Sequence, residues 1–162
     1  MTTVTLRTRL PAPADLVWAG VNTPRVLAEV SKPLIDFRPI DPPVWPDTWP
    51  DGEALAAMRL FGVLPIGRQV IGISRPPPEG EKRFLRDDGR GGAMSGIRRW
   101  DHLITVEPDG DGTGYEDRVT VEAGLRTPLV AAFARRFYRH RQARWRALAA
   151  DSARLHAMIA GQ

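Results

Sequence analysis

The last fifth of the chain is one long helical segment whose buried stripe contains basic residues. Thr127-Pro128 predicts a helix start, with the Thr127 hydroxyl as the cap and proline at the first helical position, and neither proline nor glycine follows before Ile159. A continuous helix over this stretch would be roughly 48 Å long. Steps of about 100° per residue place His140, Arg141 and Arg144 on its apolar stripe. The apolar members of the stripe are Val130, Phe133, Phe137, Leu148, Leu155 and Ile159. Because unpaired charge is costly in a dry core, acidic partners, water or a ligand must meet the middle of this helix.

Composition excludes several classes of function. A chain of 162 residues is long enough to bury a sizeable core, and we expect a single domain over residues 1–162. It has no cysteine, which excludes disulfides, thiolate nucleophiles and cysteine metal sites. The N-terminal part lacks the apolar run of a signal peptide, and no stretch approaches transmembrane length. We therefore expect a cytoplasmic protein without a transmembrane segment.

The net charge of +4 comes almost entirely from arginine. The arginines are scattered along the chain and no recognised nucleic-acid-binding module accompanies them, so we expect no nucleic-acid partner. A cluster on the exposed side of the last helix is most simply a solvated surface. Its members are Arg135, Arg136, Arg139 and Arg146.

Hydrophobic alternation and turn residues predict an α+β fold. The expected strands are residues 3–10, 34–40, 53–61, 69–74, 82–86, 97–107 and 115–123. Two short helices follow the first strand: one carries Leu16, Val17 and Trp18, and the other opens at Thr23-Pro24. Short turns between successive strands predict an antiparallel sheet. A curved sheet around one long helix leaves a space in which small-molecule pockets form.

Two unusual segments connect these elements. Residues 41–50 are rich in proline and contain two tryptophans, which is consistent with a lid over a pocket or with a rigid loop whose aromatic rings fold back on the sheet. Residues 89–96 are rich in glycine but lack the complete dinucleotide-binding spacing and the lysine of a phosphate loop. We interpret the second segment as a connection.

The order of elements resembles the START/Bet v 1-like superfamily, also called SRPBCC, which includes polyketide cyclase/dehydrase and lipid-transport groups. The motifs that carry the resemblance are Leu10-Pro-Ala-Pro-Ala-Asp-Leu-Val-Trp18, Leu60-Phe-Gly-Val-Leu-Pro-Ile-Gly67, Arg99-Trp-Asp-His102, Gly112-Thr-Gly-Tyr-Glu-Asp117 with Arg118-Val119, and Phe137-Tyr-Arg-His-Arg-Gln142. The resemblance implies a helix-grip fold, in which a curved antiparallel sheet of about seven strands wraps around a long C-terminal helix. It implies no single activity, because the superfamily contains carriers, receptors, cyclases and hydrolases.

Alternation on the last two strands predicts a polar cluster in front of the long helix. Trp100 and His102 share a face with apolar residues of one strand, and Asp117 does so on the next. If these faces point at the helix, His102 and Asp117 meet Arg141, together with Arg144 or His140. The candidate ligand-binding residues are therefore Trp100, His102, Asp117, Phe137, His140, Arg141 and Arg144.

This cluster has two interpretations. It can be the polar anchor of a ligand or an acid/base pair, because histidine beside a carboxylate moves protons and arginine binds carboxylates through two hydrogen bonds. It can equally be a structural ion pair that joins helix to sheet. We expect no metal ion and no cofactor, because His102, His140 and His156 have no metal-binding spacing. Ser74 also stands outside any nucleophile elbow.

Three functions follow as hypotheses. The first is binding, transport or sensing of a small hydrophobic or aromatic ligand in an internal cavity. The second is a cyclase, aromatase or dehydratase that acts on a polyketide-like substrate with His102 and Asp117 or Arg141. The third is a regulatory protein whose basic helix face binds a partner. The sequence leaves the oligomeric state, monomer or homodimer, open.

Overall fold

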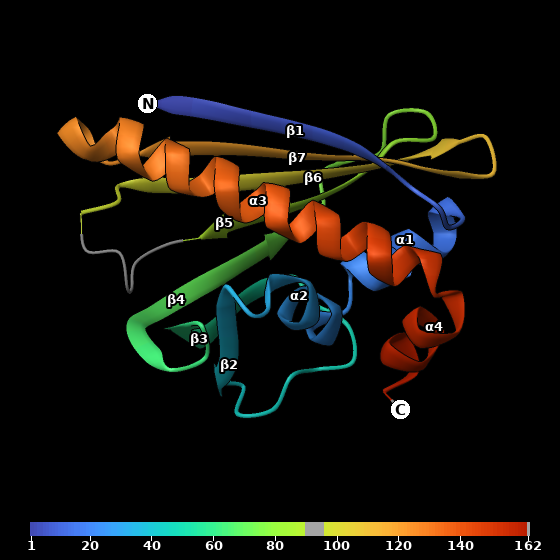
Figure 1. Ribbon diagram of the computed structural model, residues 1–162, viewed down its shortest axis with the longest axis horizontal. Helices are drawn as coiled ribbons and strands as arrows, with labels where there is room; N and C mark the ends of the chain where they lie inside the picture. Colours follow the sequence, from blue (N-terminus) through green and yellow to red (C-terminus); the bar gives the residue numbers. More distant parts are fainter. Residues whose placement is uncertain (90–95, 162) are drawn as a thin grey trace.

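The computed structural model describes residues 1–89 and 96–161, and a seven-stranded antiparallel sheet runs through them (Figure 1). Its strands are β1 (Thr2–Leu10), β2 (Ile35–Asp41), β3 (Gly52–Leu60), β4 (Leu64–Ser74), β5 (Arg83–Gly89), β6 (Arg99–Asp109) and β7 (Gly112–Glu122). The order across the sheet is β1-β7-β6-β5-β4-β3-β2. The first strand therefore pairs with the last, and every other pair is formed by neighbours in sequence.

The helices lie on one face of this sheet. They are α1 (Ala14–Val21), α2 (Pro24–Ser31), α3 (Thr127–Ala150) and α4 (Ser152–Ala160). The long α3 crosses the sheet, and α1, α2 and α4 gather around its C-terminal half (Figure 1). The predicted α+β class and helix-grip arrangement are confirmed. None of the helices in the described part of the chain is long and apolar enough to cross a lipid bilayer.

The prediction of one continuous helix from Thr127 to Ile159 was wrong. The helical conformation is interrupted at Asp151, whose φ and ψ are −108° and 78°. Its carboxylate accepts a hydrogen bond of 3.0 Å from the backbone N–H of Arg154 and thereby caps α4. An aspartate can thus end one helix and start the next without proline or glycine. The turn directs Leu155 into the core, against Gly20 of α1.

Thr127 also differs from its predicted role as a cap. Its hydroxyl accepts a hydrogen bond of 3.0 Å from the N–H of Ala123 and donates one of 2.7 Å to the carbonyl of Gly124. It therefore stabilises the 3-10 turn of residues Gly124–Arg126, which leads into α3. Pro128 does occupy the first turn of the helix, as predicted.

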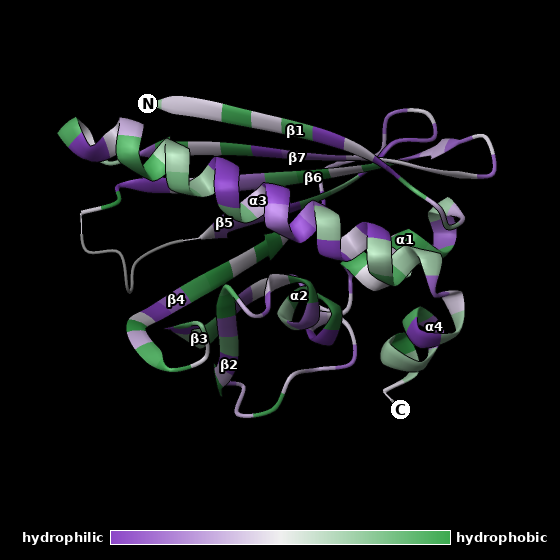
Figure 2. Ribbon diagram, viewed as in Figure 1, coloured by the Kyte–Doolittle hydropathy of each residue, from purple (hydrophilic) through white to green (hydrophobic). Residues whose placement is uncertain are grey.

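The predicted alternation on β6 and β7 is confirmed. Trp100 and His102 are buried on β6, and Asp117 is buried on β7. The apolar core falls into two clusters, one around Trp145 and Leu155 and one around Trp100, Phe137 and Tyr138. Figure 2 shows hydrophilic residues in the middle of α3, between its more hydrophobic ends. Polar groups therefore lie where the two apolar clusters meet.

The proline-rich segment folds back on the molecule. Trp49 is buried, and its backbone N–H donates a hydrogen bond of 2.8 Å to the backbone carbonyl of Asn22. Arg75 stabilises the same part of the loop by donating a hydrogen bond of 2.6 Å to the backbone carbonyl of Trp49. Trp45 packs edge-to-face on Trp49 with ring centroids 5.5 Å apart. Of the two interpretations of this segment, the structure agrees with the folded-back loop. Most of the glycine-rich connection, residues 90–95, lies outside the described residues.

Candidate functional site

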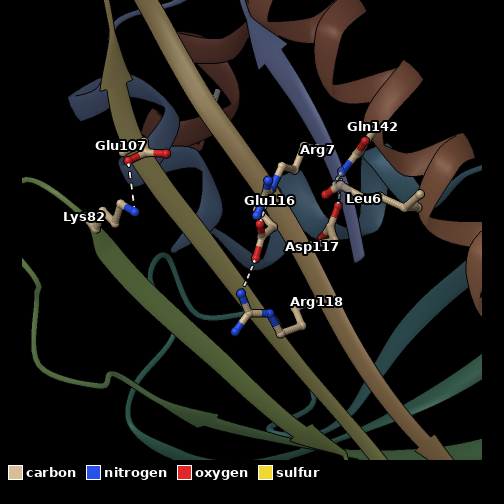
Figure 3. A network of polar contacts seen from close by, with 8 residues as sticks. All are labelled: Leu6, Arg7, Lys82, Glu107, Glu116, Asp117, Arg118 and Gln142. Atoms are coloured by element: carbon tan, nitrogen blue, oxygen red, sulfur yellow. Dashed lines mark hydrogen bonds and ion pairs between the residues drawn. The ribbon is translucent and has the colours of Figure 1, made fainter. Parts of the chain in front are cut away.

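Asp117 is the centre of a buried hydrogen-bond cluster between β7 and α3. One of its oxygens, Oδ1, receives hydrogen bonds from Nε2 of His102 at 2.7 Å and from the hydroxyl of Tyr115 at 3.2 Å. The other, Oδ2, accepts a hydrogen bond of 2.9 Å from the side-chain amide of Gln142 on α3. That amide also donates to the carbonyl of Leu6 at 3.0 Å, so that β1, β7 and α3 are joined at one point (Figure 3).

The opposite face of β7 carries a different kind of network. Glu116 accepts hydrogen bonds from Arg7 at 2.5 Å and from Arg118 at 2.9 Å, and both arginines are exposed to solvent. Figure 3 shows this surface network on the other side of the strand from Asp117 and Gln142. Adjacent carboxylates on one strand therefore occupy very different environments, and surface pairs of this kind stabilise little.

The protonation states of the inner cluster follow from its contacts. Burial alone would raise the pKa of Asp117, but the hydrogen bonds from His102 and Gln142 and the charge of Arg141 outweigh it and hold this pKa below its usual range. Burial lowers the pKa of His102, and the contact with Asp117 offsets this only in part. Burial and Asp117 raise the pKa of Tyr115. The cluster thus contains an ionised carboxylate with neutral imidazole and phenol donors.

Arg141 lies on the buried face of α3, one residue before Gln142. It is only 4% exposed, and its guanidinium lies over the rings of Phe137 and Tyr138, at 5.8 and 5.1 Å from their centroids. Within the described residues no group accepts a hydrogen bond from it, and its Nε is fully buried without a partner. A buried guanidinium usually has several hydrogen-bond acceptors, so this one is exceptional.

Two small hollows, both lined by described residues, adjoin Arg141. The tryptophan hollow has a volume of about 20 Å³ and lies among Trp49, Trp145, His102 and Tyr115. The phenylalanine hollow has a volume of about 40 Å³. Its lining includes Phe37, Met58, Phe133, Phe137 and Trp100. Both hollows are large enough for water molecules, whereas sites for drug-sized ligands typically have about 300–1,000 Å³. The space predicted between sheet and helix is therefore mostly filled in this conformation.

Asp87 on β5 is the second charged group that borders both hollows, together with Arg141, Leu27 and Ile71. The carboxylate accepts a hydrogen bond of 3.2 Å from the N–H of Gly72. Burial raises the pKa of Asp87 to about 7, against the opposing effects of the Gly72 hydrogen bond and the charge of Arg141. Asp87 and Arg141 thus face the same space from sheet and helix without forming an ion pair.

The structure brings together some of the predicted site residues. Trp100 and Phe137 line the phenylalanine hollow, His102 lines the tryptophan hollow, and Arg141 lines both. Asp117 is hydrogen-bonded to His102 and lines neither hollow. His140 and Arg144 lie elsewhere. Nε2 of His140 is 2.8 Å from the carbonyl of Lys32, and Arg144 donates a hydrogen bond of 2.9 Å to Glu29 of α2. Both residues join α3 to the α2 region, because the buried face of α3 is centred on Ala134, Tyr138, Arg141 and Trp145 rather than on the predicted stripe.

Sequence reasoning missed Asp87, Tyr115, Tyr138 and Gln142. The predicted strand at residues 82–86 ends one residue before Asp87, so it does not include the position at which Asp87 alternates with Leu85. Gln142 and Tyr138 lie on the side of α3 that the predicted stripe excluded. Tyr115 shares a face with Asp117, and this alternation was the signal that could have found it.

The described residues contain no group of three or more histidine, aspartate or glutamate side chains that could hold a metal ion. The polar side chains that line the hollows are a guanidinium, a carboxyl group, an imidazole, an amide and two phenols, from Arg141, Asp87, His102, Gln69, Tyr115 and Tyr138. Such a set suits hydrogen bonding to an organic ligand.

Comparison with known proteins places the chain in a family. Residues 8–149 match the family described as Domain of unknown function (DUF8410). No curated protein sequence matches the chain significantly. Among solved structures, a protein from Arthrobacter aurescens is 16% identical with a TM-score of 0.68, and 94% of this chain and 88% of that chain are covered.

Two further structures are similar in fold. A START superfamily protein from Mycobacterium smegmatis is 12% identical with a TM-score of 0.63, covering 92% of this chain and 97% of that one. Ara h 8.0201 is also 12% identical, with a TM-score of 0.62 and coverages of 93% and 98%. The resemblance inferred from the sequence motifs is thus confirmed at the level of the fold. The chain has the START/Bet v 1-like helix-grip fold and belongs to the family of domains of unknown function DUF8410.

Proposed function

We propose that the protein binds a small hydrophobic or amphipathic molecule between the sheet and α3. The observation that carries this proposal is the guanidinium of Arg141, which is buried beside two apolar hollows and has no hydrogen-bond acceptor among the described residues. A purely architectural arginine would be paired, because an uncompensated buried charge is strongly destabilising. START/Bet v 1-like folds also provide an internal space between sheet and C-terminal helix, which is consistent with this role.

The ligand has to widen the hollows, because together they are far smaller than a ligand pocket. The side chains between them include Leu27 on α2, which is only half-buried. α2 is joined to α3 through polar contacts, including that between Arg144 and Glu29. This contact is only partly buried, and an outward displacement of the Leu27 side chain, with a small movement of α2, would join the two hollows.

Binding of the neutral fluorescent probe N-phenyl-1-naphthylamine tests the proposal. We expect the purified protein to enhance the probe's fluorescence, and the variant Leu27→Trp, which fills the space common to both hollows, to weaken binding about tenfold or more. The control Leu129→Trp adds the same ring at an exposed position of α3 and should leave binding unchanged. Equal binding by both variants, or no binding at all, would refute an internal site.

An acid/base enzyme of the cyclase or dehydratase type is the second candidate. Nε2 of His102 donates to Asp117, which leaves Nδ1 as the basic nitrogen, and no described group donates a hydrogen bond to it. His102 also lines the tryptophan hollow. A carboxylate that orients a histidine in this way is a common arrangement for general base catalysis.

Turnover of a linear β-polyketone thioester, followed by mass spectrometry, tests this second candidate. We expect His102→Gln to reduce the rate about a hundredfold or more, because glutamine keeps a donor to Asp117 but cannot accept a proton. Equal rates for the wild type and His102→Gln would show that the histidine serves only the architecture.

A further inference from the structure

Arg141, which lines both hollows, forms no ion pair with any residue in the described part of the protein. Both oxygens of Asp117 already accept hydrogen bonds, from His102 and Tyr115 on one side and from Gln142 on the other. Asp87 interacts with Arg141 electrostatically but forms no ion pair with it. The N–H groups of Arg141 therefore lack hydrogen-bond acceptors in a buried region that bulk water does not reach.

The arrangement around this arginine indicates the charge of the missing partner. Arg141 is the only cation that lines either hollow in the described chain, whereas Asp87 lines both and Asp117 lies close behind. A dianion such as a phosphate would face two carboxyl groups with one guanidinium to balance it. A carboxylate has a single charge, and its planar shape matches the two parallel N–H donors of a guanidinium.

Asp87 can take part when it is protonated. Its carboxyl group then donates an O–H from the sheet toward the space that Arg141 faces from the helix. The N–H of Gly72 binds Oδ1 at 3.2 Å, which leaves the other oxygen to carry the proton. A bound carboxylate would thus receive hydrogen bonds from two sides.

Building on the proposed function, we propose that the ligand is an amphipathic monocarboxylate whose carboxylate is held by Arg141 and the protonated Asp87. Its apolar part then extends into the phenylalanine hollow, the larger of the two. This direction follows from the lining, since Phe37, Met58 and Phe133 offer only apolar surface there. The tryptophan hollow, which contains His102 and Tyr115, remains as a place for water or a polar substituent.

Binding of such an anion should be coupled to the protonation of Asp87. The charged and titratable groups around Asp87 are Asp88 on its own strand, Asp101 and His102 on β6, Tyr115 and Asp117 on β7, and Tyr138 and Arg141 on α3. The pKa of Asp101 and that of Asp117 are lowered, that of His102 is lowered, and those of Tyr115, Tyr138 and Arg141 are raised. None of these six groups changes its charge between about pH 7 and 9, whereas Asp87 does.

The test compares carboxylates with their own neutral amides by isothermal titration calorimetry. The probes are decanoate with decanamide and 1-naphthylacetate with 1-naphthylacetamide. At about pH 6 we expect the carboxylate of at least one pair to bind about tenfold tighter than its amide, as a charge-assisted bidentate contact requires. This preference should disappear in Arg141→Met and persist in part in Arg141→Lys. The control Arg139→Met removes an exposed arginine of the same helix and should keep the full preference.

The pH dependence provides a second readout that does not depend on the arginine variants. In the wild type the dissociation constant of the carboxylate should rise up to about tenfold per pH unit above pH 7, because an ionised Asp87 competes for Arg141. In Asp87→Asn it should stay constant over the same range, and circular dichroism verifies that each variant is folded.

Three outcomes would overturn the inference. If the amides bind as tightly as the carboxylates, the protein binds apolar ligands and the anion site is wrong while the proposed function stands. If the preference survives Arg141→Met, the anion binds elsewhere. If no member of either pair binds and N-phenyl-1-naphthylamine does not bind either, both proposals fail.

Discussion

Asp117→Ala should lower the free energy of unfolding by about 3–5 kcal/mol, the largest loss that we expect for any polar residue in this protein. The side chain is only 1% exposed and accepts hydrogen bonds from three buried donors. Its removal leaves the imidazole of His102 and the hydroxyl of Tyr115 without an acceptor, and each such group costs about 1–3 kcal/mol. The amide of Gln142 keeps only its hydrogen bond to the carbonyl of Leu6. It also removes one of the carboxylates whose charge stabilises the buried guanidinium of Arg141. Urea unfolding followed by circular dichroism measures the loss.

Glu116→Ala is the matched control for this substitution. Glu116 is the preceding residue on the same strand and carries the same charge, but its partners Arg7 and Arg118 are exposed (Figure 3). We expect a loss of at most about 1 kcal/mol. A similar loss in both variants would mean that charge on β7, rather than the buried cluster, determines the effect.

Asp117→Ala also separates the two interpretations of the buried cluster. A destabilised Asp117→Ala that binds N-phenyl-1-naphthylamine and decanoate as tightly as the wild type would assign Asp117 to the architecture. A protein that stays stable but loses binding would assign it to the site. The geometry favours the first result, because all three donors of Asp117 come from the protein itself and neither hollow reaches its carboxylate.

Sequence patterns predicted the fold and the middle of the site because both depend on local periodicity. Alternation with a period of two directed His102 and Asp117 to the same side, and their contact at 2.7 Å follows from the pairing of His102 with Val119 on the neighbouring strand. The buried polar position at Arg141 follows from helical spacing. Its two predicted neighbours, His140 and Arg144, were misplaced because a helix stripe defined from apolar residues alone can be rotated away from the true buried face.

Other features depend on side-chain packing that no pattern contains. Asp87 became part of the site because β5 extends to Gly89, beyond the predicted end of the strand. Trp49 and Trp145, which come from distant parts of the chain, are buried and occupy the space around the tryptophan hollow. The sequence therefore indicated a polar group between sheet and helix but could not indicate how little space surrounds it.

Asp87→Asn should change how stability depends on pH, with an expected effect of about 2–4 kcal/mol between pH 4 and 8. The pKa of Asp87 is raised from its ordinary value to about 7 in the folded protein. Unfolded chains therefore release the proton of Asp87 at a lower pH than folded ones, and ionisation favours unfolding. This contribution of Asp87 to stability is complete below about pH 4 and is lost as the pH rises through 7. The half-buried position of Asp87 reduces the loss from its upper limit of about 4 kcal/mol.

The measurement is the difference in unfolding free energy between Asp87→Asn and the wild type, from urea unfolding at intervals between about pH 4.5 and 8. The difference should grow in favour of the variant as the pH rises, since asparagine keeps the acceptor for Gly72 but cannot ionise. Because His102 has a lowered pKa, it destabilises the folded state below about pH 6.5 in both proteins, and this contribution cancels in the difference.

Asp101→Asn is the control, because it removes a carboxylate whose pKa is shifted in the opposite direction. The pKa of Asp101 is lowered, mainly by its hydrogen bond from Arg86, so its contribution to stability is present above about pH 4 and lost only below it. Between pH 5 and 8 this variant should be less stable than the wild type by a constant amount. If the unfolding free energy of Asp87→Asn also differed from that of the wild type by a constant amount over this pH range, Asp87 would titrate with an ordinary pKa. An ionised carboxylate would then lie beside Arg141 throughout the range. In that case the site would already contain its own anion, and the proposed monocarboxylate would have no place in it.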